Sequence, residues 1–324
     1  MAECLHNYGI LLIRDPRAVQ KDNEEYIDLM EKYFESRGDM LYSGREVQDE
    51  RPDCFYQVGV CPKENEIARD HSSKIRAYDD VNRPVSPLVP VFDAKWRFMW
   101  KIGERPVEAS DNFPQVIPTD FPEWEHKMDK WGYKLLNAVK VVAEMAAVGM
   151  GLEKEAFTQR MEGGAHLLAP TGSDLVKNDV GAIFAGFHYD IAFMTIHGKS
   201  RFPGLYVWTR ENKKMQVKVP EGCLLIQSGK TFENITGGYI LAGFHEVVYT
   251  EQTKEAMLKA QAEDKSHWRV SSTLFSHFRY NVDCTPMPEL KHLYSEEDAK
   301  AYGSMTAFDI LMTELDATNM VQTV

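Results

Sequence analysis

The sequence lacks a disulfide framework, an excess of positive charge and any long hydrophobic run. Its 324 residues hold five cysteines, an odd number without a CxxC pair, which is typical of a protein from a reducing compartment. The formal net charge of −12 disfavours attraction to phosphate backbones, so we expect no nucleic-acid partner. No apolar stretch approaches the roughly 20 residues of a membrane span, and the N-terminus lacks the basic region of a signal peptide. We therefore expect a cytoplasmic monomer without a membrane partner.

Nucleotide-binding motifs are also missing. Gly149 and Gly151 follow a helical pattern, not a strand, and the third glycine of a dinucleotide-binding loop is absent. The sequence holds neither a Walker motif nor a kinase glycine-rich loop. GTPase and kinase functions are therefore excluded.

The first half of the chain is mainly helical by its pattern. Residues 8–14 predict a buried strand, and residues 20–36 predict a helix that ends near Gly38. Residues 45–120 are rich in Pro, Asp and Arg and predict loops with short helices. Residues 122–152 predict a long helix whose apolar stripe packs on the outside of the core. Three aromatic residues in the loop-rich region are expected in the core: Trp96, Phe98 and Trp100.

From about residue 161 the period changes to that of strands. About eight short β-like runs separated by turn residues predict a β-sandwich or jelly roll. One polar, helix-favouring segment, residues 251–267, interrupts them and predicts a surface helix inserted between two strands. We interpret the chain as one domain, residues 1–324. It comprises a helical and loop region packed on the core (1–160), the jelly-roll core (161–283) and a C-terminal segment (284–324).

A candidate metal site lies in the stretch GFHYDIAFMTIHG. His188 and Asp190 are two residues apart, so on a β-strand both side chains point to the same face. His245, 55 positions beyond Asp190, is the natural third ligand from a neighbouring strand. Two histidines and one carboxylate form the facial triad of non-haem Fe(II) oxygenases. The alternative is a buried pair in which Asp190 only orients His188, and we interpret His197 as structural.

An anion receptor is the second candidate. Arg269 and Ser271 are two apart in WRVSSTLF and share a strand face. A guanidinium fork with a hydroxyl suits a carboxylate. The alternative for Arg269 is an ordinary ion pair. His277, in LFSHFRY, is a core histidine or a residue near the mouth of the site.

Together these motifs resemble the iron- and 2-oxoglutarate-dependent oxygenases of the isopenicillin N synthase type. That family carries H-x-D, a more distant His and R-x-S, here at His188, Asp190, His245, Arg269 and Ser271. Residues 204–207 (GLYV) and 219–248 resemble the segments between those motifs, and the likeness covers most of residues 8–280. The resemblance implies a mixed α+β chain, mainly β, with a double-stranded β-helix (jelly-roll) core.

Three departures from the family pattern matter. The 23 residues between His245 and Arg269 exceed the usual spacer, and the helix expected at 251–267 accounts for them. The family often has an Asn-x-Tyr before H-x-D whose Tyr helps to bind 2-oxoglutarate, but GAHLLAPTGSD has no Tyr. A few relatives use R-x-S for the substrate and do not need 2-oxoglutarate.

The resemblance implies an oxidoreductase. Fe(II) would be held by His188, Asp190 and His245, and 2-oxoglutarate by Arg269 and Ser271. With O2, such an enzyme oxidises a C–H bond of a small-molecule metabolite by hydroxylation, desaturation or ring closure, and amino-acid-derived natural-product biosynthesis is one setting for it. We expect substrate contacts from residues 45–110, from the strand face around Tyr206 and Phe275, and from the C-terminal segment. The alternatives are an oxidase without 2-oxoglutarate, a cupin-type metal enzyme, or a non-catalytic jelly-roll binding protein.

Overall fold

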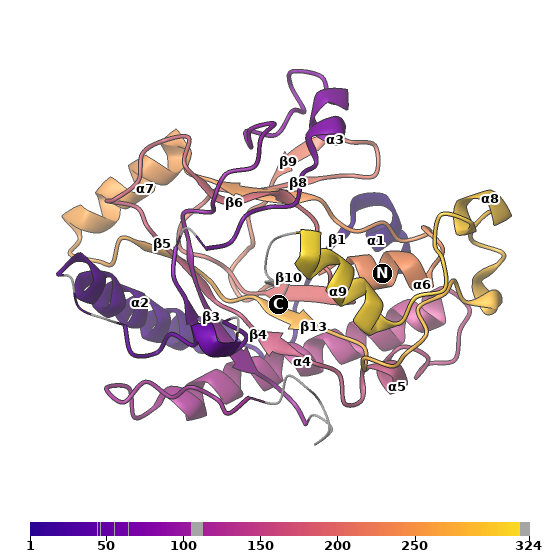
Figure 1. Ribbon diagram of the computed structural model, residues 1–324, viewed down its shortest axis with the longest axis horizontal. Coiled ribbons are helices and arrows are strands. Elements are labelled where there is room, and N and C mark those ends of the chain that lie inside the picture. Colours follow the sequence, from indigo (N-terminus) through magenta and orange to yellow (C-terminus); the bar gives the residue numbers. More distant parts are fainter. Residues whose placement is uncertain (44, 46, 55, 64, 105–112, 318–324) are drawn as a thin grey trace.

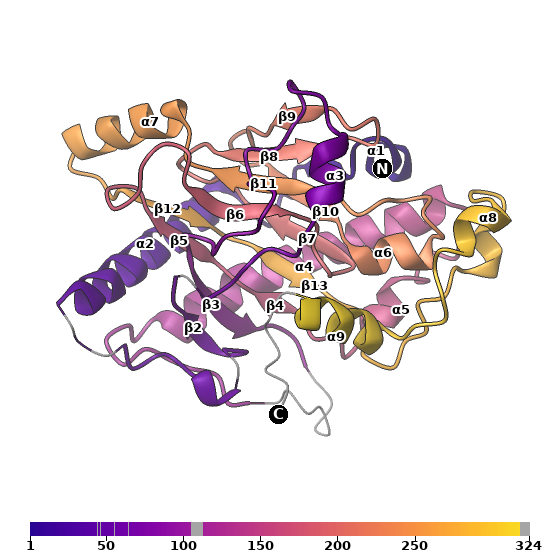
Figure 2. The ribbon, with the colours of Figure 1, turned by 45° about the horizontal axis from the view of Figure 1, so that its top comes forward.

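Two β-sheets form the centre of the protein, and helices cover one of them on its outer face (Figures 1 and 2). The computed structural model describes residues 1–43, 45, 47–54, 56–63, 65–104 and 113–317. A cavity between the sheets is lined by strands of both. This arrangement confirms the predicted jelly-roll core. Among the described residues, no helix has the length and apolar character needed to cross a membrane.

The larger sheet has the order β1-β10-β7-β13-β4-β3-β5-β12, with β2 paired to β3. All the pairings in it are antiparallel. Its strands are β1 (Ile10–Ile13), β2 (Gly59–Cys61), β3 (Trp96–Lys101), β4 (Leu167–Leu168), β5 (Thr171–Asp174), β7 (Met194–His197), β10 (Leu224–Ser228), β12 (Trp268–Ser271) and β13 (Leu274–Ser276).

The smaller sheet has the order β6-β11-β8-β9, again antiparallel. Its strands are β6 (Ile183–His188), β8 (Leu205–Trp208), β9 (Lys214–Gln216) and β11 (His245–Val248). The pairing of β11 with β6 shifts register between His245 and Val248, so the ladder is irregular beside His245. Such bulges re-aim side chains and are common near functional sites.

Two long helices cover the outer face of the larger sheet. α2 (Gln20–Tyr42) packs on β12 and β5, and α4 (Trp124–Gly149) packs on β13 and β7. The main hydrophobic core lies between these helices and the sheet. This core confirms the expectation that the apolar stripe of α4 packs against the outside of the β core.

The prediction that Gly38 ends the second helix is wrong, because α2 continues to Tyr42. Arg37, one residue earlier, donates to Asp49 at 2.6 Å and to Asp120 at 2.8 Å. A glycine inside a helix costs about 1 kcal/mol, whereas each hydrogen bond between charged groups contributes about 1.5–3 kcal/mol. The ion pairs of Arg37 therefore outweigh the glycine.

The loop prediction for residues 45–120 is also incomplete, because β2 and β3 lie there and extend the larger sheet. On β3, alternate side chains point to opposite faces of the sheet. Trp96, Phe98 and Trp100 are 3%, 0% and 1% exposed in the main core, as expected. Arg97 and Met99 point the other way and line cavities. Residues 105–112 of this range lie outside the described residues.

The remaining helices connect or flank the sheets. They are α1 (Ala2–Tyr8), α3 (Ser72–Ala77), α5 (Thr158–Met161), α6 (Lys230–Ile235), α7 (Glu251–Ala262), α8 (Glu296–Ala299) and α9 (Ala307–Ala317), with short 3-10 turns at Pro52–Cys54 and Pro288–Leu290. α7 is the predicted insertion, and Thr250 and Thr253 cap its start reciprocally. It joins β11 of one sheet to β12 of the other, so it interrupts no strand pair. α9 lies in front of β13 (Figure 1).

Candidate metal centre

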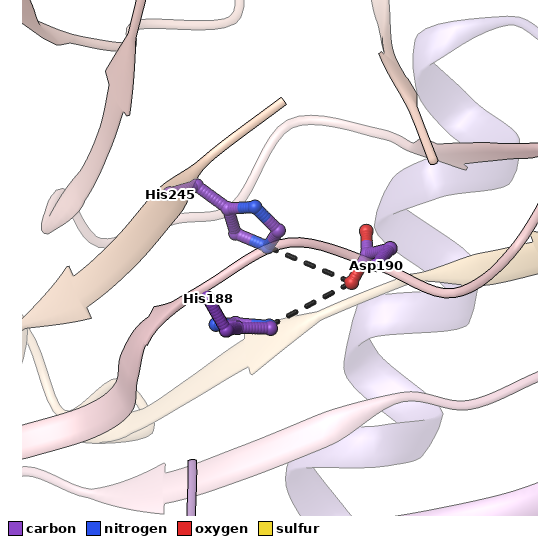
Figure 3. Close-up of side chains that lie close together, drawn as sticks. All are labelled: His188, Asp190 and His245. Atoms are coloured by element: carbon purple, nitrogen blue, oxygen red, sulfur yellow. Dashed lines mark ion pairs between the residues drawn. The ribbon is translucent and has the colours of Figure 1, made fainter. Parts of the chain in front are cut away.

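Strand pairing brings His188, Asp190 and His245 together (Figure 3). His188 ends β6, His245 begins β11, and the two are direct partners in the antiparallel ladder. Their ring centroids lie 4.2 Å apart. The Nε2 atoms of His188 and His245 lie 3.6 and 3.7 Å from Oδ1 of Asp190. One ligand atom of each residue lies within 4.8 Å of the others, which is a spacing that a single metal ion can span.

Backbone carbonyls orient both imidazole rings. Nδ1 of His188 lies 2.5 Å from the carbonyl oxygen of Gly186, and Nδ1 of His245 lies 3.0 Å from that of Gly243. A carbonyl oxygen only accepts, so each Nδ1 must carry the proton and donate it. Nε2 of each ring is then the nitrogen that faces Asp190. This tautomer is the one that metal-binding histidines need, and such partners to the second ring nitrogen are usual at metal sites.

Asp190 is buried and ionised. Burial by itself would raise its pKa, but His245, His188 and a hydrogen bond from Thr195 hold that pKa well below its usual range. The Thr195 hydroxyl donates to Oδ2 at 2.6 Å, which leaves Oδ1 to face the imidazoles. Burial also lowers the pKa of His245 to about 4, so His245 is neutral at neutral pH. A buried carboxylate beside two imidazoles is a ligand set suited to a cation.

A cavity of about 290 Å³ joins this group to Arg269. Arg269 and Ser271 lie on the same face of β12 and both line the cavity, as the spacing predicts. Arg269 is 6% exposed, and its Nε donates to the carbonyl oxygen of Pro203 at 3.0 Å. Burial lowers its pKa to about 10, so it still carries its charge at neutral pH. No carboxylate pairs with it in the part of the chain that the structure describes.

Hydroxyl side chains line the same cavity as Arg269. Ser173 and Thr171 on β5 face Arg269 and Ser271 in the strand register, and both line the cavity. Ser271 and Thr273 share a hydrogen bond of 2.7 Å. A buried cation that has no carboxylate partner among the described residues, in a cavity lined by hydroxyls, suits a small anion.

The other residues singled out in the sequence have different places. His197 is 8% exposed, lines the Arg269 cavity and has its Nδ1 3.0 Å from the carbonyl oxygen of Gly198. It lies outside the metal-ligand group found among the described residues. His277 and Phe275 line a second cavity that also contains His188 and Asp190. Tyr206 packs beside the Lys214 ammonium, at 4.6 Å, and lines neither cavity.

Lys95 and Arg97, which line both cavities, were not foreseen from the sequence. The signal that could have found them is the alternation around β3. Burial of Trp96 and Phe98 on one face requires their neighbours to face the other side.

Glu246 is a second residue that sequence reasoning missed. It follows His245 directly and is fully buried. Its carboxylate accepts hydrogen bonds from the backbone of Val85 at 2.9 Å and from the backbone and hydroxyl of Ser86 at 3.0 and 2.7 Å. Lys214 pairs with it at 3.0 Å. Glu246 thus ties residues 85–86 to the strand that carries a metal-ligand candidate.

Solved structures of similar fold include several oxygenases. A putative 2OG-Fe(II) oxygenase family protein from Caulobacter crescentus has a TM-score of 0.68 at 19% identity, covering 98% of this chain and 92% of that one. JOX2 in complex with 2OG, Fe and JA has a TM-score of 0.66 at 13% identity, covering 97% and 79%. A full-length Neurospora crassa protein in complex with alpha-KG has a TM-score of 0.70 at 17% identity, covering 98% and 88%.

The chain has the fold of these oxygenases. At such low identities the likeness is one of fold. No family model matches the sequence, and no curated protein matches it. The activity has to be argued from the site itself.

Proposed function

We propose that the protein is an Fe(II)- and 2-oxoglutarate-dependent oxygenase that oxidises a C–H bond of a small molecule. The observation that carries this proposal is one cavity with a His188–Asp190–His245 group and a buried, unpaired Arg269. A metal group alone fits several chemistries. The added receptor for an anion selects the class that uses an anionic co-substrate.

The ligand set suits iron. Two imidazoles and one carboxylate are the ligand set of non-haem Fe(II) oxygenases, so His188, Asp190 and His245 would hold the iron and leave room for the co-substrate and dioxygen. Bound Fe(II) would supply the activation of O2, which no side chain can perform. The chain itself fixes the imidazole tautomers through Gly186 and Gly243 and holds Asp190 ionised through Thr195.

The receptor suits 2-oxoglutarate. Arg269 would pair with the carboxylate far from the metal, with Ser271 donating beside it, because both line the same cavity as the metal-ligand candidates. Thr171 and Ser173 offer hydroxyl donors in place of the tyrosine that related proteins often have. The Neurospora crassa and JOX2 structures were determined with alpha-KG and 2OG respectively, which supports the same co-substrate here.

The substrate that we propose is a small molecule. The Neurospora crassa protein has been crystallised with thymine and JOX2 with JA, and both support a small-molecule substrate for this chain. We place the protein with oxygenases of the isopenicillin N synthase type, acting as a cytoplasmic monomer in amino-acid-derived natural-product biosynthesis. The retained Asp190 favours hydroxylation, desaturation or ring closure over halogenation.

The test is anaerobic titration of the purified protein with Fe(II) and then 2-oxoglutarate. We expect a weak visible charge-transfer band from the chelate, and release of succinate once oxygen and a substrate are added. His188→Ala should abolish the band, and Arg269→Ala should require much more 2-oxoglutarate. His292→Ala is the matched control, because His292 is exposed and outside the site.

Each failure has its own meaning. Iron binding without a band would favour an oxidase or cupin-type enzyme that does not use 2-oxoglutarate. Failure to bind iron would overturn the proposal and favour a non-catalytic binding protein.

A further inference from the structure

A second cavity, of about 190 Å³, also reaches the metal-ligand group. It shares Lys95, Arg97, His188, Asp190 and Phe275 with the first cavity but does not contain Arg269 or Ser271. A molecule in it would lie beside the metal without competing for the anion receptor. Its volume is below the roughly 300–1,000 Å³ of typical ligand pockets, so its occupant is smaller than a typical drug.

About half of the wall of this cavity comes from three segments outside the predicted core, namely residues 66–71, β3 and α9. Tyr189 and His277, which directly follow β6 and β13, belong to the part that the core supplies. Apolar contact is offered by Met99, Phe275, Leu311 and Leu315. The occupant therefore needs an apolar body. Charged side chains line the remaining wall, and their pairing decides what polar group that body can carry.

Two cations and two carboxylates of the wall neutralise one another. Lys95 contacts Asp93 and lies 2.9 Å from Glu66. Arg97 lies 3.2 Å from Glu66 on one side and 5.7 Å from the ring centroid of Phe275 on the other. The side chains of Lys95 and Asp93 are both 5% exposed, so their charges are shielded from water and held in place.

The third cation is paired across the cavity with the C-terminal helix. Nη1 of Arg69 lies 2.5 Å from Oε1 of Glu314 on α9. The hydroxyl of Tyr189, which lies between His188 and Asp190 in the chain, donates to the same oxygen at 2.8 Å. The Glu314 side chain is 8% exposed. Burial lowers the pKa of His71, another wall residue, to about 4, so His71 adds no charge at neutral pH.

The contrast with the first cavity is the basis of the inference. Arg269, which lines only the first cavity, lacks a carboxylate partner among the described residues, whereas Arg69, which lines only the second, is paired with Glu314. Lys95 and Arg97 line both cavities and are also paired. An anion entering the second cavity would lose its hydration and find these cations already paired, which is strongly unfavourable. An uncharged polar group would lose less and still meet guanidinium and hydroxyl donors.

We infer that the second cavity binds the substrate and that this substrate is a small uncharged molecule. Glu314 excludes substrates with a carboxylate because it already forms the ion pair with Arg69. The inference rests on the proposed function, because it takes the metal-ligand group to be the reaction centre. Glu314 is a specificity-determining residue in this scheme, and its removal should free a guanidinium for an anionic substrate.

The experiment uses matched probes that differ only in charge, phenylacetamide against phenylacetate and nicotinamide against nicotinate. Each is titrated into the anaerobic Fe(II)–2-oxoglutarate complex of the full chain, and the change in its charge-transfer band gives a dissociation constant. We expect the amide of at least one pair to bind at least about tenfold more tightly than its acid. Tighter binding of the acids, or no response to any probe, would overturn the inference.

Variants test the part played by Glu314. Glu314→Gln should improve binding of the acids relative to the amides by at least about tenfold. Arg69→Gln leaves the Glu314 carboxylate without its partner and should make binding of the acids weaker than in wild type. Asp316→Asn makes the same charge change on an exposed position of α9 and should leave the preference unchanged. An unaltered preference in Glu314→Gln would contradict the assignment.

The band without a probe keeps the two proposals separate. If wild type gives no band, the proposed function has failed. If the band forms in wild type and in Glu314→Gln, the variant is folded at the metal centre and its probe preference tests the inference alone.

Discussion

Replacing Arg269 by methionine should stabilise the ligand-free protein and remove its stabilisation by 2-oxoglutarate. Most substitutions of buried residues destabilise a protein. Arg269 should differ because its charge is buried and has no carboxylate partner in the part of the chain that the structure describes. Methionine is similar in length and flexible enough to occupy the same space.

The magnitude follows from the pKa and one hydrogen bond. Burial lowers the pKa of Arg269 from 12.5 to about 10. At about 1.4 kcal/mol per pKa unit, the buried cation destabilises the folded state by about 3 kcal/mol at neutral pH. The lost hydrogen bond to Pro203 offsets about 1 kcal/mol. The net gain of about 2 kcal/mol corresponds to an increase in Tm of about 3 °C for a chain of this length.

The assay is thermal unfolding of the anaerobic Fe(II) form with and without 2-oxoglutarate. At a co-substrate concentration about 100 times the Kd, wild type should gain about 2.7 kcal/mol, or about 4 °C. Loss of one partner of a buried charge pair costs about 2–5 kcal/mol, so Arg269→Met should gain at most about 1 kcal/mol at that concentration. The Tm advantage of the variant in the ligand-free state should thus disappear or reverse on adding 2-oxoglutarate.

Arg201 gives the matched control. It is an arginine of the opposite kind, because Glu24 and Asp28 lie 2.6 and 2.7 Å from its guanidinium and the buried Glu31 lies at 2.5 Å. Arg201→Met should lower Tm in both conditions. If Arg269→Met also lowers the Tm of the ligand-free protein, or keeps the 2-oxoglutarate response, the interpretation of Arg269 as an unpaired receptor is refuted.

Three further predictions concern other buried groups. Thr195→Val removes the hydroxyl that donates to Asp190 and should weaken Fe(II) binding about 10- to 100-fold in a competition titration; unchanged affinity would contradict its supporting role. Glu246→Gln should lower the free energy of unfolding in urea by about 3–5 kcal/mol, because Lys214 loses a buried partner; a loss below about 1 kcal/mol would count against this. Burial raises the pKa of Glu31 from 4.5 to about 7, so its stabilising contribution is complete below pH 4.5 and is lost as pH rises through 7. The urea concentration at the unfolding midpoint should therefore decrease as the pH is raised from about 5 to about 8 in wild type. The decrease should be smaller in Glu31→Gln.

The parts of the site that follow from local spacing could be predicted from the sequence. The period of two on a strand correctly places Arg269 with Ser271 on β12. The same reasoning was only partly right for His188 and Asp190, because β6 ends at His188 and Asp190 follows it, yet all four residues line one cavity. The pairing of His245 with His188 joins residues far apart in the chain, so spacing alone offered only a candidate. There the resemblance to known oxygenases supplied what local rules could not.

Strands without a strand-like sequence were missed, for physical reasons. β5 has the sequence TGSD, which has no apolar alternation. Its Gly172 lies against the ring of Phe34 on α2, and a Cβ there would come within 2.3 Å of that ring. The close approach of α2 therefore requires glycine where β-propensity favours a branched residue. Only the tertiary packing shows why the segment is a strand.

The motifs also did not predict which segments would line the second cavity. The motifs mark strands β6, β11 and β12, which carry His188, His245 and Arg269. About half of the wall of the second cavity comes instead from residues 66–71, β3 and α9, where charged side chains are paired. Motifs report chemistry that many folds of this type share, while the pairing of charges outside them sets which molecule can approach. In our proposal, the choice of substrate therefore depends on segments, such as α9, that contribute no metal-ligand candidate.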